Sequence, residues 1–278
     1  MEQTLQRTDL DLGADVDGVF SAEYADAVRY DLEYGATHVD GPFYRSLLTE
    51  PGSVLDLACG TGRIGLLLAQ DGHDVVGVDS APSMIERAEA KAAFLLGDAE
   101  EETVGRAAFQ VGDVTSLNLR RKFDLVVLGG NALQAFLADA ERDAVLATVW
   151  RHLAPEGHFA FAVRFPHASE LATRYDSAVP WFAYTDADAR TVYVSGTQHY
   201  HPVAQVMHHV TYRVLEDGTA VEAPTHLALR YSFPQELESA LRAARLEVVE
   251  RFGDFDGSPL GEGSSAMVYV CRRAAGKR

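Results

Sequence analysis

Two closely spaced glycines, Gly60 and Gly62, follow the apolar run of residues 53–57 and precede a helical pattern. Glycine permits the positive φ that a sharp strand-to-helix turn needs, and it lacks the Cβ atom that would keep a ligand away from the backbone. Gly65 completes the spacing Gly-x-Gly-x-x-Gly of dinucleotide-binding turns, and Asp79 ends the next expected strand about 20 residues on. The turn is therefore a predicted ligand site, although the glycines alone leave the ligand open.

Two further carboxylates bear on the identity of the ligand. Asp56 lies inside the first expected strand, four positions before Gly60. A strand end that faces a pyrophosphate is an unfavourable place for a second negative charge, whereas a cationic ligand suits it. Asp113 follows the apolar residues 109–111 and so ends a third expected strand, next to Val114. This combination favours a cationic ligand over a dinucleotide.

Together these residues resemble the class I S-adenosylmethionine-dependent methyltransferases, from about residue 30 to the C-terminus. The resemblance implies that residues 54–65, VLDLACGTGRIG, hold the methionine end of S-adenosyl-L-methionine. It also implies that Asp79 binds the ribose hydroxyls, and that Asp113 lies at the adenine. Tyr30 resembles a family tyrosine that closes over the methionine end, although it fits equally well as a helix-packing aromatic residue. The implied cofactor-binding residues are Tyr30, Asp56, Ala58, Gly60, Gly62, Arg63, Asp79, Ser80, Met84, Gly112, Asp113, Val114 and Gly129.

The same resemblance implies an α/β fold, with a Rossmann-like, seven-stranded, mostly parallel sheet and helices on both faces. An N-terminal helical lid and an inserted antiparallel β-meander complete it. Residues 123–128 are almost continuously apolar, which is typical of a parallel strand buried on both faces, and they end at 129–131, where open α/β sheets bind ligands. The other expected core strands are 53–57, 73–78, 109–111, 159–165, 246–251 and 266–272, with helices at 63–70, 138–152 and 234–244.

The expected insertion begins with residues 166–182, which are polar and irregular in pattern. Residues 191–198, 205–214 and 220–233 then have the pattern of three strands with short connections. Such short links cannot make parallel crossovers, so these strands should form an antiparallel meander. The expected division of the chain is an N-terminal arm and lid helices (1–50), a cofactor-binding core (51–165), an inserted substrate cover (166–233) and the completion of the core sheet (234–278).

Residues that bind the methyl acceptor are expected at strand ends and on the insertion. Asn131 follows one core strand, and Arg164, at the end of the next, suits an anionic group. An aromatic stretch at Trp181 suits a planar ring, and a histidine such as His199 suits a hydroxyl acceptor that needs a base, although most histidines are surface or satisfied residues. The expected acceptor-binding residues are Tyr24, Tyr34, Asn131, Arg164, Trp181, Tyr184, His199 and Arg230. The catalytic candidates are Asn131, His199 and Arg164, and we expect no metal site.

Composition narrows the class of partner. The net charge is −17, with 41 acidic and 24 basic residues, and the largest basic cluster is the triplet 120–122, so nucleic acid is an unfavourable substrate. The two cysteines, Cys59 and Cys271, are expected to be reduced structural thiols. The sequence has neither a membrane-spanning apolar run nor a signal-peptide core, which predicts a cytoplasmic protein, either a monomer or a homodimer.

Three hypotheses follow. The first is transfer of a methyl group from S-adenosylmethionine to a nitrogen or oxygen of a small metabolite or natural product, as in secondary metabolism, mainly by proximity and orientation. The second is a nicotinamide-dependent oxidoreductase, which Asp56 and Asp113 disfavour, as does the absence of a Tyr-x-x-x-Lys pair. The third is a descendant of the methyltransferase fold that binds the cofactor without methylating.

Overall fold

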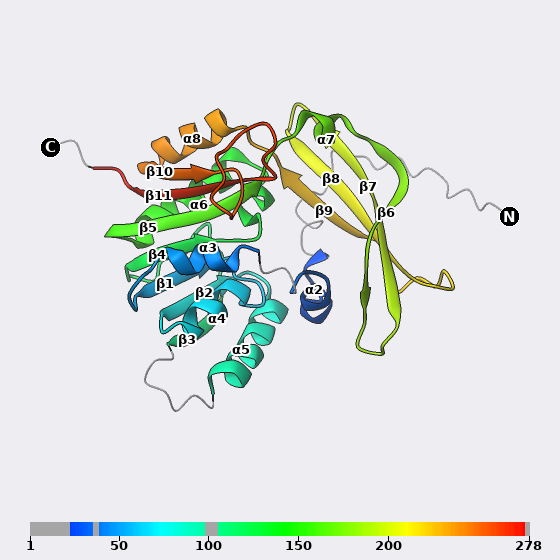
Figure 1. Cartoon of the computed structure of the whole chain (residues 1–278), viewed down its shortest axis with the longest axis horizontal. Helices are drawn as coiled ribbons and strands as arrows, with labels where there is room; N and C mark the ends of the chain where they lie inside the picture. Colours follow the sequence, from blue (N-terminus) through cyan, green and yellow to red (C-terminus); the bar gives the residue numbers. More distant parts are fainter. Residues whose placement is uncertain (1–22, 36–38, 98–104, 276–278) are drawn as a thin grey trace.

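The computed structural model describes residues 23–35, 39–97 and 105–275, and contains two separate sheets (Figure 1). The larger sheet has seven strands in the order β10-β11-β5-β4-β1-β2-β3. Strands β1 to β5 are parallel to their neighbours among themselves, and β11 is antiparallel to both β5 and β10. The strands are β1 (Ser53–Leu57), β2 (Asp74–Asp79), β3 (Arg106–Val111), β4 (Phe123–Leu128), β5 (Leu153–Arg164), β10 (Leu246–Phe252) and β11 (Ala266–Arg273). The predicted Rossmann-like, mostly parallel sheet is confirmed.

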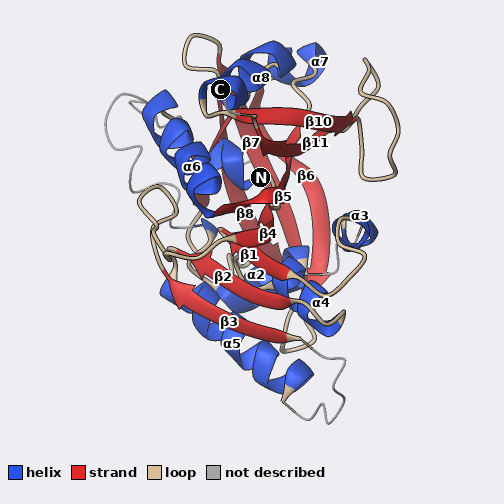
Figure 2. Ribbon diagram, turned by 90° about the vertical axis from the view of Figure 1, so that its left-hand side faces the viewer, coloured by secondary structure: helices blue, strands red, loops and turns tan. Residues whose placement is uncertain are grey.

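Apolar residues on alternate positions of the central strands fill the core on both sides of this sheet. Leu55 of β1 and Val126 of β4 belong to one buried cluster, together with residues of α6 (Asp139–His152) and α8 (Pro234–Ala243). Val54 and Leu125, one position earlier, belong to a second cluster. That second cluster includes residues of α3 (Gly41–Ser46) and α4 (Arg63–Gln70). Figure 2 shows α6 on one side of the strands and α3 and α4 on the other.

The smaller sheet is antiparallel and has four strands, in the order β6-β7-β8-β9. They are β6 (Tyr175–Thr185), β7 (Thr191–His201), β8 (Val206–Leu215) and β9 (Thr225–Arg230). The expectation that residues 166–182 are irregular is therefore wrong, because this stretch holds α7 (Ala168–Ala172) and most of β6. The register of β6 against β7 shifts twice and most of its side chains are exposed, so an alternating apolar pattern is missing from its sequence.

The remaining elements connect these layers. Helix α5 (Pro82–Leu96) packs on β3, and the short 3₁₀ helix η1 (Ala132–Ala135) follows β4. Helix α2 (Ala27–Tyr34) lies between the two sheets and packs against both α5 and β6 (Figure 1). Residues 1–22, part of the expected N-terminal arm, lie outside the described residues, as do residues 36–38 and 98–104. The division of the chain at residues 50, 165 and 233 stays a prediction.

None of the helices within the described ranges is long and apolar enough to cross a membrane.

Candidate active site

The turn between β1 and α4 has the backbone that its glycines predict. Gly60 and Gly62 have φ of 54° and 78°, which L side chains adopt only at a cost. A Cβ atom on Gly62 would also lie 2.8 Å from Cζ of Phe109, so packing against β3 requires glycine there. At Gly60 the nearest such atom is Cε1 of Tyr30, 3.9 Å from where a Cβ would stand, so the backbone there is open to a ligand.

Asp56 supports this turn from inside the sheet. Its Oδ2 accepts a hydrogen bond from the Gly65 backbone N–H at 3.0 Å, so the strand carboxylate holds the first turn of α4. Its residue is only 2% exposed, and this burial raises the pKa of Asp56 to about 7. A positive charge bound nearby would favour the ionised form of Asp56 and lower that pKa.

Asp79 joins the ends of β1 and β2. Its two carboxylate oxygens accept hydrogen bonds from the backbone N–H groups of Gly60, at 2.8 Å, and Ala81, at 2.9 Å. Burial raises the pKa of Asp79. A carboxylate offers about four lone-pair sites, so two remain for a ligand that lies against the Gly60 turn.

Asp113 follows the end of β3 at the rim of the site. The hydroxyl of Thr115 donates to it at 2.7 Å, and this bond and the Thr115 backbone N–H hold the pKa of Asp113 below its ordinary value. The preceding Gly112 donates its backbone N–H to the carbonyl oxygen of Asp79 at 2.9 Å. The residues after β3 are thereby joined to the end of β2.

These strand ends open into a cavity of about 1430 Å³ that also reaches the four-stranded sheet. Every expected cofactor residue except Gly62 lines it, and Gly62 acts through the backbone of the turn. The opposite wall comes from the end of β7, the turn that follows it, β8 and β9, with His201, Ala204, Val206, His208, Leu227 and Leu229. The insertion therefore stands over the carboxyl ends of the core strands.

Three tyrosines cover the cavity from the N-terminal side. The ring centroids of Tyr24 and Tyr30 are 5.8 Å apart, and those of Tyr30 and Tyr34 are 5.2 Å apart. All three line the cavity, and burial raises the pKa of each. They are neutral phenols at physiological pH, with aromatic faces suited to a cation.

Arg63 lies at the start of α4 and lines the cavity beside Tyr30. Its guanidinium forms a bidentate pair with Asp40, with N–O distances of 2.5 and 2.7 Å. Asp40 lies 23 residues before Arg63, and nothing near it in the sequence marks it as the partner of that arginine. The pair fixes the direction of the guanidinium at the methionine end of the predicted site.

The expected acceptor residues divide into two groups. Tyr24, Tyr34, Asn131 and Arg164 line the cavity, and Asn131 has a positive φ of 62° at the end of β4. The other four do not line it: Trp181, Tyr184, His199 and Arg230. His208, the neighbour of His199 on the adjacent strand, lines it instead. Burial, followed by the nearby His199, lowers the pKa of His208.

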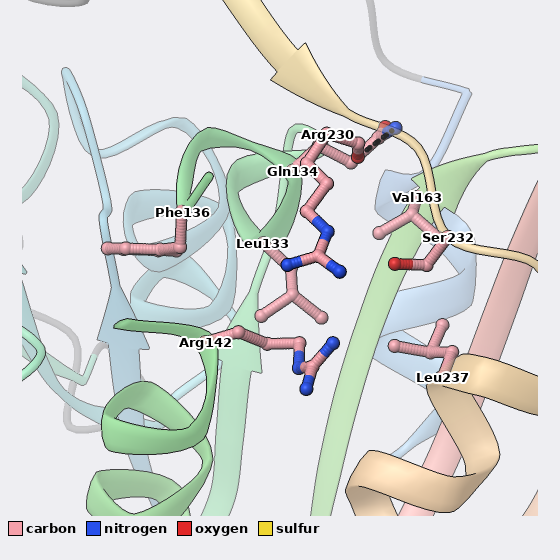
Figure 3. A pocket seen from close by; sticks show the side chains of 8 residues that line it. All are labelled: Leu133, Gln134, Phe136, Arg142, Val163, Arg230, Ser232 and Leu237. Carbon is pink, nitrogen blue, oxygen red and sulfur yellow. Dashed lines mark hydrogen bonds between the residues drawn. The ribbon is translucent and has the colours of Figure 1, made fainter. Parts of the chain in front are cut away.

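Contacts elsewhere in the protein explain the positions of two of these four residues. A Cβ on Gly196 would lie 2.1 Å from the Trp181 ring, so that indole lies over Gly196, and it meets the His209 ring edge-on at 5.8 Å. Arg230 pairs with Asp139 at 2.7 Å and Glu236 at 3.0 Å. Figure 3 shows it reaching toward Arg142 in a separate small pocket, beside Gln134.

Comparisons with known proteins identify a family model and several similar proteins. Residues 54–157 match the methyltransferase domain family. A cypemycin N-terminal methyltransferase from Streptomyces is 27% identical over 80% of this chain and 83% of its own length. The structure of the CcbJ methyltransferase from Streptomyces caelestis matches with a TM-score of 0.73 at 24% identity, covering 91% of this chain and 98% of that one. The S-adenosylmethionine-bound amino pentose methyltransferase CalS10 from Micromonospora echinaspora matches with a TM-score of 0.66 at 19% identity, covering 88% and 97%.

In its fold and in these matches the chain is similar to the class I S-adenosylmethionine-dependent methyltransferases, and they support an S-adenosylmethionine-dependent methyltransferase. Its cofactor is S-adenosyl-L-methionine. The residues present suit that group, since the open backbone at Gly60 and the two remaining acceptor sites of Asp79 match a nucleoside ribose. The nicotinamide alternative loses its support.

Proposed function

We propose that this methyltransferase transfers the methyl group to a nitrogen or oxygen atom of a small metabolite or natural product, and that an amine is the preferred acceptor. The observation that carries the proposal is the cavity shared by the glycine turn and the four-stranded sheet. The names of similar proteins are consistent with it, since one is a cypemycin N-terminal methyltransferase and another an amino pentose methyltransferase.

When bound, S-adenosylmethionine supplies an electrophilic methyl group on a sulfonium. The protein's part is then to align the acceptor and to keep water out, and such positioning can supply roughly 7–11 kcal/mol in ideal cases. Apolar side chains of Phe136, Leu227 and Leu229 line the cavity and exclude water. Asn131 and Arg164 offer polar contacts from the ends of β4 and β5.

The charges around the cavity favour a cationic acceptor. Arg63 is paired with Asp40, and Arg164 with Glu170 at 3.0 Å, so each of these two cations already has a counter-ion. Within the described residues, Asp79, Asp113 and Glu141 line the cavity without an ion pair to a side chain. This excess of negative charge attracts an ammonium group and repels an anion.

His208 offers a proton acceptor for such an amine. Its lowered pKa leaves the imidazole neutral at physiological pH, so it can take the proton that an ammonium acceptor must lose before its lone pair reacts. A hydroxyl acceptor would place a heavier demand on the same residue, because an alcohol is a weaker nucleophile until it is deprotonated.

The test is a set of reactions with S-adenosylmethionine deuterated in its methyl group, followed by mass spectrometry. The acceptors are matched pairs of small amines and alcohols, or anilines and phenols, on the same carbon skeletons. We expect label in the amine of a pair, loss of transfer in Asp79→Ala, and normal transfer in Glu247→Ala, an exposed carboxylate of β10. Labelling of hydroxyls alone would refute the amine preference. Tight cofactor binding without transfer to any acceptor in a broad metabolite panel would argue against the function itself.

A further inference from the structure

Arg213, on β8, is a fully buried arginine outside the cavity. Its side chain is 0% exposed and extends from the four-stranded sheet to the N-terminal segment. There its guanidinium forms a bidentate pair with Glu33 of α2, at 2.5 and 2.9 Å, and bonds Glu23 at 2.6 Å. The two glutamate side chains are 1% and 2% exposed. A β-strand cation thus holds two carboxylates that lie 180 and 190 residues earlier in the chain.

Further bonds close this cluster. The Thr225 hydroxyl of β9 accepts from Arg213 at 2.7 Å and donates to Glu23. Arg29 of α2 pairs with Glu222, which also lies 3.1 Å from Arg213. Removal of one partner from such a buried group leaves an uncompensated charge away from water, which is strongly unfavourable. Helix α2 is therefore firmly attached to the small sheet.

A second attachment joins α2 to the cofactor turn. Asp31 accepts from the Thr61 hydroxyl at 2.6 Å, and Thr61 stands between Gly60 and Gly62. The same carboxylate pairs with Arg87 at 2.7 Å and Lys91 at 3.0 Å, both on α5. These cations are 39% and 24% exposed, so water can replace them at lower cost than in the Arg213 cluster.

The tyrosines that cover the cavity lie between these two attachments. In a helix, residues four apart share a face, which places Arg29 with Glu33 and Tyr30 with Tyr34, while Asp31 lies one step further round. Tyr34 also contacts Phe182 of β6, with ring centroids 6.3 Å apart. The direction of the tyrosine stripe is thus set by the Arg213 cluster on one side and by Asp31 on the other.

We propose that Arg213 is a positioning residue of this enzyme, which makes α2 part of the acceptor-side sheet and aims its tyrosines at the cavity. Asp31 then joins that unit to the cofactor turn through Thr61. When the site opens, α2 stays with the small sheet and parts from the core at the Asp31 contacts. This inference rests on the proposed function only in taking the cavity as the site of the acceptor. The attachment of α2 to the small sheet does not depend on which acceptor binds.

Amide hydrogen exchange followed by mass spectrometry tests this, with S-adenosylhomocysteine as the probe. In Arg213→Met without ligand, exchange in residues 27–34 should rise roughly tenfold or more, while β1 and β4 stay as in the wild type. Arg213→Lys keeps the positive charge but not the planar, bidentate guanidinium, so its α2 exchange should lie between those of the wild type and Arg213→Met. Arg190→Met, which removes an exposed arginine paired with Asp186, is the matched control and should leave α2 unchanged.

Asp31→Asn should behave in the opposite way. Its α2 exchange without ligand should stay near the wild-type value, because the buried cluster is intact, but the dissociation constant for S-adenosylhomocysteine should rise roughly fivefold or more. If Arg213→Met does not fold, Glu33→Gln replaces it, since Glu23 still neutralises Arg213 in that variant. Unchanged α2 exchange in these cluster variants, or equal loosening of α2 by Asp31→Asn, would overturn the proposal. An absence of methyl transfer in the wild type would not, because none of these measurements uses an acceptor.

Discussion

Replacement of Asp79 tests the cofactor site at the residue where two turns meet. In Asp79→Ala the backbone N–H groups of Gly60 and Ala81 lose the carboxylate oxygens that accept from them at 2.8 and 2.9 Å. The predicted bond to the cofactor ribose is lost as well. The variant should therefore affect cofactor affinity more than it affects the fold, because burial already disfavours the charged carboxylate in the free protein.

The size of the effect follows from these bonds. A hydrogen bond to a charged group contributes about 1.5–3 kcal/mol. At about 1.4 kcal/mol per tenfold, loss of one such bond to the ribose corresponds to a fall in affinity of roughly ten- to a hundredfold. Asp79→Asn should lose nearly as much cofactor affinity. Its amide NH₂ group would face one of the two backbone N–H groups that now donate to the carboxylate.

Isothermal titration calorimetry with S-adenosylhomocysteine measures the effect, with Glu247→Ala as the control. Glu247 pairs with Arg272 on the surface of the core sheet, so its removal should leave affinity unchanged. A change of less than about threefold in Asp79→Ala, with circular dichroism and melting like those of the wild type, would refute the assignment of Asp79 to the ribose.

Two further predictions concern the turn itself. Burial raises the pKa of Asp56 from 3.8 to about 7, so between these values the folded state holds a proton that the unfolded state releases. The free energy of unfolding should therefore fall as the pH rises from about 4 to 7, by at most about 4 kcal/mol. Urea unfolding at pH 5 and pH 8 should show the part of this loss that falls above pH 5, roughly 2–3 kcal/mol, in the wild type and much less in Asp56→Asn. An equal change in the free energy of unfolding between the two pH values in both proteins would contradict the prediction. Gly62→Ala should destabilise by about 1–3 kcal/mol, from its positive φ and from the contact with Phe109. Gly257→Ala, at φ 81° with nothing within 4 Å, should cost less in the same thermal melts; equal costs would show that the Phe109 contact is unimportant.

Local patterns account for the parts of the fold that the sequence predicts well. The turn at Gly60 and Gly62 has a backbone that few residues other than glycine adopt, and β4 is buried on both faces, so the position of each is legible from residue type and periodicity. The positions of Asp79 and Asp113 are predictable for a similar reason, because each follows the end of an apolar strand pattern.

The residues that the sequence analysis missed depend on contacts between distant segments. Alternation places His208 and His209 on opposite faces of β8, but it does not say which face borders the cavity. Strand β6 escapes detection because two register shifts and exposed side chains remove its period. The carboxylates that bind Arg213 most closely, Glu23 and Glu33, lie 190 and 180 residues earlier, so only the folded chain brings them to it.

The most direct test of the central claim is calorimetric titration of the purified wild-type protein with S-adenosylmethionine, S-adenosylhomocysteine and NAD under identical conditions. The Gly60 turn and the carboxylates Asp56, Asp79 and Asp113 predict saturable, one-to-one binding of both sulfur nucleosides, with a raised melting temperature, and no binding of NAD. Binding of NAD without binding of either sulfur nucleoside would contradict the account.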